Sequence, residues 1–332
     1  MMPAIIMVGA EGEQALFENE LTPVGADDKR RGSVWLTSGQ QMYRQFDASY
    51  ANMWVHARFA VGDGAPPSGY TSIPTPIVEV GNSVRTLARI RNVDESGTTM
   101  LIAFDVATAP TGASFTSSAE IPHPQDEFIN YDINVVTSGT DMTVRFYRNE
   151  VLRHTVTVSG AFGQADRVLM QSMDTVLDWS NVWYQDVIVT DALPTVGMEL
   201  ATLVPSAVGS YSDFLNDYTA VDDAGYDQSS VISSTTPGDR ESWFFADPEF
   251  DLGDKVIYGV AITTVAQTDI AGTITDFEPF VRIGAVNYPT ADIGANNVAP
   301  NAYVSIFTQN PSTTAPWQQA ELVGLEAGIR AV

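Results

Sequence analysis

Three histidines are the only side chains of this sequence that ordinarily act as bases near neutral pH. His56 and His154 fall at alternating positions of strand-like runs, where we interpret them as partly buried structural residues. His123 lies between two prolines in IPHPQDE and is predicted to sit on a rigid loop. The order of residues along the chain does not exclude a His-Asp-Ser triad. However, the sequence has no Gly-x-Ser-x-Gly nucleophile elbow, and no histidine pair has zinc-ligand spacing.

Paired carboxylates are the other route to hydrolysis, because a sandwich that cleaves glycans projects an acid and a nucleophile from one strand face. The alternating motif of sandwich glucanases, Glu-x-Asp-x-Glu, is absent. The nearest acidic clusters are DESG at 94–97, PQDE at 124–127 and DPEFDLGD at 247–254, and all three are predicted to be loops. These absences favour binding or assembly over catalysis, so we predict that the protein is not an enzyme.

The segment DPEFDLGD also raises the question of a metal, because Asp247, Glu249 and Asp251 have the spacing that begins an EF-hand loop. The sixth and twelfth positions of that loop are leucine and tyrosine instead of glycine and glutamate, so the motif fails. A looser calcium site built from Asp247, Asp251 and Asp254 stays open beside a solvated acidic turn. No other cofactor is predicted, since the sequence has no cysteine, phosphate loop or dinucleotide fingerprint.

The charge of the chain restricts its partners. Its 332 residues carry a net charge of -25, from 41 acidic and 16 basic residues. Such a field repels phosphate backbones, so nucleic acid and anionic membranes are predicted not to be partners. We interpret the charge as a solvated acidic surface, with a cation-binding face as the alternative. The only early apolar run, at 4–8, is too short for a signal peptide or a membrane span.

Short runs that alternate apolar and polar residues fill the chain from 33 to 191, and this period of two predicts an antiparallel sandwich. Asn149-Glu150 is predicted to form a tight hairpin, and the residues at 138–141 a second one. The predicted strands are 33–36, 53–61, 77–81, 84–93, 98–106, 128–136, 142–149, 152–158, 167–173 and 182–191.

A Pro- and Gly-rich stretch at 192–209 interrupts the alternation, and we place a domain boundary near 193–198. The predicted domains are 1–192 and a smaller, also β-rich 193–332. A short helical turn passing into a final strand is expected after Trp317. The predicted strands of the second domain are 218–222, 229–236, 240–246, 255–267, 277–288 and 302–310.

An aromatic cluster lies in DTVLDWSNVWYQDVIVTDALPTVG, at 174–197. Period two along the strand places Trp183, Val187 and Val189 on the core face and Tyr184 nearer solvent or the next domain. Trp179 precedes the strand in a loop, which suits an interface or a ligand. The candidate ligand or interface residues are Trp179, Tyr184 and Trp317.

The segments NYDINVV, MTVRFYRNEVLRHTVTV and VLDWSNVWYQDVIVTD resemble the concanavalin A-like, laminin-G-like jelly roll over residues 33–191. This resemblance implies an antiparallel jelly-roll β-sandwich followed by a second, smaller β-sandwich. The second half resembles the carboxy-terminal module of structural proteins of tailed bacteriophages. The residues that carry this second resemblance are 200–205, Asp222-Asp223, Ile232-Ser233-Ser234, Gly238, Trp243-Phe244-Phe245, Pro316-Trp317, Ala320-Glu321 and 325–328.

The phage resemblance implies a non-enzymatic virion structural protein, exposed on the tail or as a head decoration and assembled in the host cytoplasm. Other virion proteins and copies of the chain itself would be its partners, and a host cell-surface glycan its contact. Two alternatives stay open. One is a free carbohydrate-binding, lectin-like module with sugar-stacking aromatics and a calcium-binding acidic loop, and the other is a glycan hydrolase with a cryptic carboxylate pair.

Overall fold

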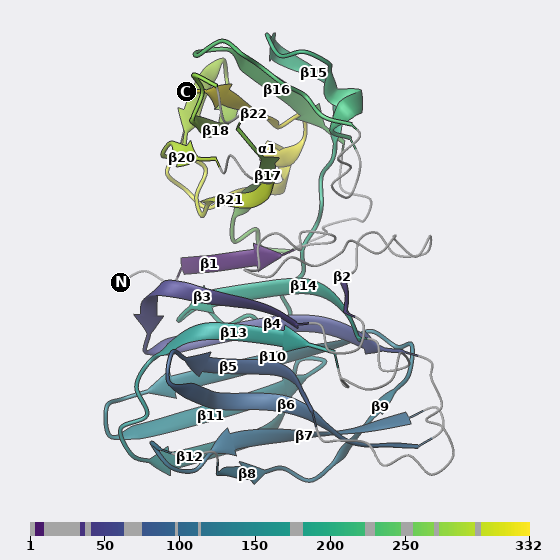
Figure 1. Cartoon of the computed structure of the whole chain (residues 1–332), viewed down its shortest axis with the longest axis vertical. Coiled ribbons are helices and arrows are strands. Elements are labelled where there is room, and N and C mark those ends of the chain that lie inside the picture. The colour runs from purple at the N-terminus through teal and green to yellow at the C-terminus, as the bar shows by residue number, and fades with distance from the viewer. Residues whose placement is uncertain are drawn as a thin grey trace. The chain divides into compact units, whose positions relative to one another are not determined.

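The computed structural model describes residues 4–9, 34–36, 41–62, 75–96, 99–111, 114–172, 182–222, 230–246, 255–268, 272–295 and 300–332. The chain divides into two compact units, Met1–Glu199 and Leu200–Val332. Both are built from antiparallel strands, so the fold is all-β and of the sandwich type, as the alternation predicts (Figure 1). No helix in the described part of the chain is long and apolar enough to cross a bilayer.

Two sheets make up the first unit, and each contains seven strands among the described residues. Sheet A has the spatial order β1 (Ala4–Gly9), β14 (Val182–Asp191), β4 (Asn52–Val61), β10 (Ile129–Thr137), β11 (Asp141–Arg148) and β12 (Val151–Ser159), with β2 (Val34–Leu36) also paired to β14. Sheet B has the order β3 (Gln41–Tyr50), β13 (Ala165–Gln171), β5 (Pro76–Asn82), β6 (Arg85–Ser96), β7 (Thr99–Ala107) and β8 (Phe115–Ser117), with β9 (Ile121–Pro124) also paired to β7.

The core of the first unit lies between the two sheets. Phe104 of sheet B stacks on Phe146 of sheet A with ring centroids 4.7 Å apart, and both side chains are fully buried. Such a pair contributes about 0.5–1.5 kcal/mol beyond its area burial. Tyr184 of sheet A reaches across the core and donates its hydroxyl hydrogen to the carbonyl oxygen of Ile77, at 2.7 Å. One face of each sheet therefore faces inward, and the opposite, outer faces carry the polar residues.

The second unit pairs a larger sheet with a two-stranded one. Among the described residues, sheet C has the order β15 (Pro205–Ser212), β16 (Arg240–Phe245), β22 (Glu326–Ala331), β18 (Asp276–Ile283) and β19 (Val286–Pro289), with β20 (Ile293–Gly294) also paired to β18. Strands β17 (Val260–Ala266) and β21 (Asn301–Phe307) form the smaller sheet. The described residues of this unit also form the 3-10 helix η2 (Tyr218–Ala220) and the α-helix α1 (Gln319–Leu322).

Several local predictions are confirmed. The turn between β11 and β12 has positive φ at Asn149 and Glu150, 46° and 66°, as a two-residue hairpin turn requires. Residues 138–140 connect β10 to β11 as a second hairpin. After Trp317 the chain forms the helical turn α1 and then strand β22. Each of these predictions rests on contacts within a few residues of sequence.

Other predictions are corrected by the structure. The run 218–222 contains the 3-10 helix η2 instead of a strand, and the described part of 229–236 makes a single bridge between Ser233 and Leu215. The run 277–288 is two strands joined at Gly284 and Ala285, whose φ angles are 57° and 71°. Acidic residues predicted in a loop at 94–96 belong to β6, paired with β7.

The boundary between the units falls at Glu199, after the predicted 192. Residues 193–199 belong to the first unit because the Thr195 hydroxyl donates to Asp132 and because Met198 is buried. The later part of the Pro- and Gly-rich stretch, where no strand was predicted, enters sheet C as β15.

Candidate functional site

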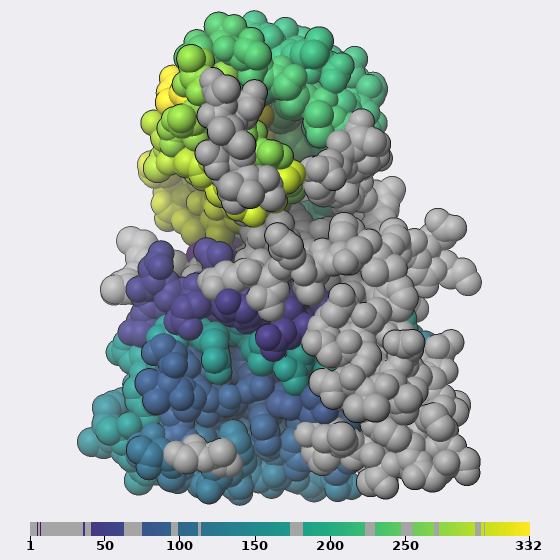
Figure 2. All heavy atoms as spheres, in the orientation of Figure 1, coloured from purple at the N-terminus to yellow at the C-terminus, as the bar shows by residue number. Residues whose placement is uncertain are grey.

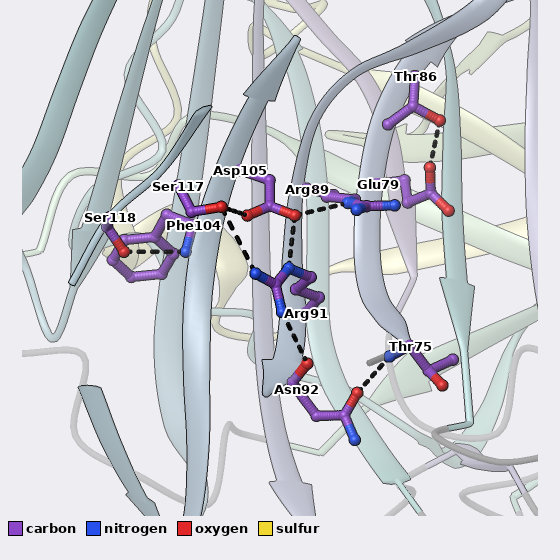
Figure 3. Close-up of polar contacts among 10 residues, drawn as sticks. All are labelled: Thr75, Glu79, Thr86, Arg89, Arg91, Asn92, Phe104, Asp105, Ser117 and Ser118. Atoms are coloured by element: carbon purple, nitrogen blue, oxygen red, sulfur yellow. Dashed lines mark hydrogen bonds and ion pairs between the residues drawn. The ribbon is translucent and has the colours of Figure 1, made fainter. Parts of the chain in front are cut away.

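A row of polar side chains crosses the outer face of sheet B. Register pairs Glu79 of β5 with Arg89 of β6, Arg89 with Asp105 of β7, and Asp105 with Ser117 of β8. Paired residues of neighbouring strands project to the same side of a sheet, so the four side chains form one line (Figure 3). Phe104, the residue before Asp105 on β7, points the other way, into the core. Arg91, two residues after Arg89, joins the row from the same face.

Asp105 is the centre of this row. Its Oδ2 accepts hydrogen bonds from Nε of Arg89 at 2.9 Å and from Nε of Arg91 at 2.6 Å. Its Oδ1 accepts from the Ser117 hydroxyl at 2.6 Å. The carboxylate is only 1% exposed, while the side chains of Arg89 and Arg91 are 24% and 17% exposed. A buried carboxylate, drawn between the two arginines in Figure 3, thus holds two cations that are partly exposed.

The two guanidinium groups keep most of their hydrogen-bond donors outside this contact. Arginine has five N–H donors, and each side chain uses only Nε on Asp105. The Arg91 Nη atoms make long contacts, 3.4 Å to the Asn92 carbonyl and 3.5 Å to Ser117. Among the described residues the Nη atoms of Arg89 make no hydrogen bond, and the guanidinium carbon of this residue lies 4.1 Å from the centroid of the Phe115 ring. Guanidinium donors on partly exposed side chains of this kind can bind a ligand.

Further residues extend this outer face. The Thr86 hydroxyl donates to the Glu79 carboxylate, which holds that acid beside Arg89. Arg167 of β13 is paired with Gly81, and a Cβ on this glycine would lie 3.3 Å from Nη2 of Arg167. The guanidinium of Arg167 therefore occupies the space above Gly81. The partly exposed ring of Tyr43, on edge strand β3, adds an aromatic surface. The blue area low in Figure 2 belongs to this face.

A second buried polar cluster lies on the outer face of sheet A. Nδ1 of His56 is 2.8 Å from Oδ1 of Asp132, and the Thr195 hydroxyl donates to the same oxygen at 2.7 Å. All three side chains are at most 1% exposed. In a catalytic triad the nucleophile contacts the histidine, whereas here the hydroxyl contacts the aspartate. The Thr195 hydroxyl links residues 193–199 to the sheet, and in the described part of the chain no nucleophile contacts His56.

The other two histidines are not placed for acid–base work. His123 belongs to strand β9, not to a loop, and its ring is fully buried against Phe59 and 2.8 Å from the Tyr131 hydroxyl. Burial, with a smaller contribution from Arg148, lowers the pKa of His123 to about 3, and burial raises the pKa of Tyr131. His154, on strand β12 at the end of sheet A, has its pKa lowered by burial.

Two aromatic residues predicted to meet a ligand or partner are core residues. Tyr184 is 1% exposed, so its predicted position nearer solvent is wrong. A β-bulge at Asp186, with φ 48°, shifts the alternation of β14, so Tyr184 before it and Val187 and Val189 after it are all buried. Trp183, predicted to be a core residue, is only partly buried.

Trp317 is 2% exposed and packs in the core of the second unit. Its neighbours there are Val281, Leu325 and Ala327, and its indole Nε1 donates to the Phe307 carbonyl at 2.8 Å. Trp317, a candidate ligand or interface residue, is therefore a core residue in this structure. The remaining candidates, Trp179 and the calcium residues Asp247, Asp251 and Asp254, lie outside the described residues. In the part that is described, no group of three or more acidic or histidine side chains could hold a metal.

The outer-face arginines were not among the residues singled out from the sequence. A signal was nevertheless present: Arg89, Arg91 and Asp105 are charges inside alternating strand runs, and charges at such positions are costly unless paired. What the sequence did not reveal is that strand pairing brings the two arginines onto the aspartate, since that depends on the register of β6 with β7.

No family model matches the sequence, and no curated protein matches it either. Solved structures align with parts of the fold. The CBM2 module of the evolved Dit of Lactobacillus casei BL23 phage J-1 is 16% identical, covering 57% of this chain and 89% of the module, with a TM-score of 0.34. An endo-1,3-beta-glucanase from Streptomyces sioyaensis is 11% identical, covering 57% of this chain and 96% of its own, with a TM-score of 0.38. Likeness at this level carries no argument about function.

Proposed function

We propose that this protein is a non-enzymatic glycan-binding protein that contacts sugars through the outer face of sheet B. The observation that carries the proposal is the pair of guanidinium groups that Asp105 holds through their Nε atoms, on side chains that are 24% and 17% exposed. Sugar hydroxyl and acidic groups need donors fixed in position, because a mobile side chain loses conformational entropy on binding. The buried carboxylate holds these donors before any ligand arrives. Tyr43, on the same face, offers a ring on which a sugar can pack.

The same geometry favours binding over hydrolysis. A glycosidase needs one carboxyl group as acid and another as nucleophile or base. Three donors already occupy the oxygen atoms of Asp105, and Glu79 is engaged by the Thr86 hydroxyl. Neither carboxylate is free to attack a sugar or to exchange a proton with one. We therefore keep catalysis out of the proposed function.

Binding to a glycan array tests the proposal. Asp105→Ala should lose at least about tenfold in affinity for any glycan that the wild-type protein binds, because both arginines lose their anchor. Arg145→Gln is the matched control, since Arg145 donates to Asn134 on the outer face of the other sheet. A silent array, or equal binding by the Asp105 variant, would contradict the proposal. Release of reducing ends from a bound glycan would contradict its non-enzymatic part.

The proposal includes a setting on the virion of a tailed bacteriophage, exposed on the tail or as a head decoration. This setting rests on the sequence resemblance of the second unit alone. Other virion proteins and further copies of the chain would then be its partners, and a host cell-surface glycan its contact. Mass spectrometry of purified particles should detect the chain, and its absence from particles would remove the virion setting without affecting the glycan-binding test.

A further inference from the structure

The outer face of sheet B also carries information about the chemical class of its ligand. Among the side chains that are described on this face are three guanidinium groups, those of Arg89, Arg91 and Arg167, and the two carboxylates of Glu79 and Asp105. Counting one charge each, three positive and two negative groups leave one positive charge. That local balance is opposite in sign to the net charge of -25 on the whole chain.

We propose that the glycan bound here is acidic, and that Arg89 and Arg91 hold its carboxylate or sulfate group. This inference rests on the proposed function. Both arginines use Nε on Asp105, which leaves Nη N–H groups for a ligand: those of Arg89, and those of Arg91 that its long contacts to Asn92 and Ser117 do not use. Two parallel N–H groups on the edge of a guanidinium group match two oxygen atoms of a carboxylate or sulfate. Hydrogen bonds of this charge-assisted type are about twice as strong as those to a neutral hydroxyl.

Burial sharpens the preference for an anion. The negative charge of Asp105 lies below the surface, because this side chain is only 1% exposed. The arginine side chains that it holds are 24% and 17% exposed. An approaching ligand therefore meets the cations before the anion. Meanwhile the acidic remainder of the chain repels densely charged polymers such as nucleic acid. Local cations on an otherwise acidic protein favour a glycan with separated acidic groups over a densely charged polymer.

Matched polysaccharides separate acidity from sugar identity. Polygalacturonate and its methyl ester differ in the charge of the carboxyl group, and dextran sulfate and dextran differ in sulfate. The two pairs also distinguish a carboxylate from a sulfate ligand. Calorimetric or biosensor titration should show binding to at least one acidic member and about tenfold weaker binding to its neutral counterpart. Added salt should weaken the acidic interaction.

Lysine variants test the arginine edge itself. Arg89→Lys and Arg91→Lys keep the charge, but a single ammonium group placed on Asp105 leaves no second edge for the ligand. Each should bind the acidic polysaccharide about tenfold more weakly. Arg145→Lys, on the other sheet, should bind like the wild type. Thermal unfolding of each variant checks that the fold is kept.

The outcomes separate the two proposals. Equal binding of acidic and neutral partners would overturn the acidic class but leave glycan binding standing. Wild-type affinity in both lysine variants would show that overall charge is sufficient, and would overturn the role given to the arginine edges. Binding of duplex DNA as tight as that of the acidic glycan, lost in the same variants, would overturn selectivity for glycans. If neither polysaccharide pair nor the array gives binding, both proposals fail.

Discussion

Both outer faces of the first unit carry a buried aspartate that accepts hydrogen bonds from a basic side chain and from a hydroxyl. On sheet A, Asp132 binds His56 and Thr195, and all three side chains are at most 1% exposed. On sheet B, Asp105 binds two arginines that are 24% and 17% exposed. The hydroxyl on sheet A comes from a segment that follows the last strand of the sheet, whereas Ser117 on sheet B belongs to an exposed strand position.

The difference shows how one chemical pattern serves two purposes. On sheet A, residues 193–199 of the chain cover the polar cluster, and the hydrogen bond from Thr195 to Asp132 holds these residues in place. On sheet B the donors that the aspartate positions extend to the surface, where a ligand can take the place of that covering segment. Whether a buried carboxylate on the outer face of a sandwich has a structural or a ligand-binding role therefore depends on whether the chain covers the side chains bound to it. The Asp132 cluster is thus closed, because the chain covers it, and the Asp105 cluster is open, because its arginines are partly exposed.

Replacing Asp132 should have the largest effect. Asp132→Ala leaves His56 and the Thr195 hydroxyl without a shared acceptor in a fully buried place. We expect the free energy of unfolding to fall by about 3 kcal/mol, measured by chemical denaturation. Asp132→Asn, which keeps an acceptor oxygen, should lose less. A loss below about 1 kcal/mol for the alanine variant would show that this cluster is as open to water as the one on sheet B.

The core shared by the two faces should make the protein sensitive to acid. The pKa of His123 is about 3 in the folded chain and about 6.5 in an unfolded one, so the unfolded state takes up the proton first. The stabilisation is complete above pH 6.5 and is lost as the pH falls towards 3. By pH 4.5 the unfolding free energy should drop by about 2–3 kcal/mol from this histidine. His123→Gln should lower the pH dependence by that amount, and an unchanged dependence would contradict the assignment.

Replacing Asp105 should cost less stability than replacing Asp132. In Asp105→Ala the freed guanidinium groups can be hydrated because they already reach the surface. We expect a loss of about 1–2 kcal/mol by chemical denaturation, together with the loss of glycan binding. A loss as large as that of Asp132→Ala would mean that the two clusters are equally shielded from water, and would contradict the difference proposed between the two faces.

The smallest effects should come from the two hydroxyl groups. Thr195→Val removes a buried donor to Asp132 with little change of shape and should cost about 1 kcal/mol. Ser117→Ala removes the equivalent donor to Asp105 at an exposed position and should stay within about 0.5 kcal/mol of the wild type. Parallel thermal unfolding of both variants measures the difference. Reversed magnitudes would contradict the distinction between a closed and an open face.

The fold was largely predictable where the signal is local. Strand β14 spans Val182–Asp191, the range that alternation predicts, and the Asn149-Glu150 hairpin follows from turn chemistry. The orientation of Tyr184 was not predictable, because it depends on a bulge at Asp186. This residue has a positive φ, which is usually signalled in a sequence by glycine. Strand β15 was hidden in a stretch rich in proline and glycine, and it is stabilised by pairing with β16, distant in sequence.

The candidate site could be predicted less well than the fold. A search for linear motifs finds residues that are neighbours in sequence, whereas Arg89 and Asp105 meet across two strands. Whether these two residues form a binding site depends on the strand register and on the exposure of their side chains, and a single sequence specifies neither directly. Trp317 shows the converse: an aromatic residue in a conspicuous motif is held in a core, with its indole N–H satisfied by a backbone carbonyl.

The row of Glu79, Arg89, Asp105 and Ser117 draws one residue from each of four strands. A slip of one strand by one residue would turn its member of the row to the opposite side of the sheet. A ligand that engages the row therefore recognises the correct pairing of β5 to β8 as well as the side chains. By mass action, such a ligand stabilises the correctly assembled sheet over every misaligned one, so occupancy of this face also acts as a check on folding.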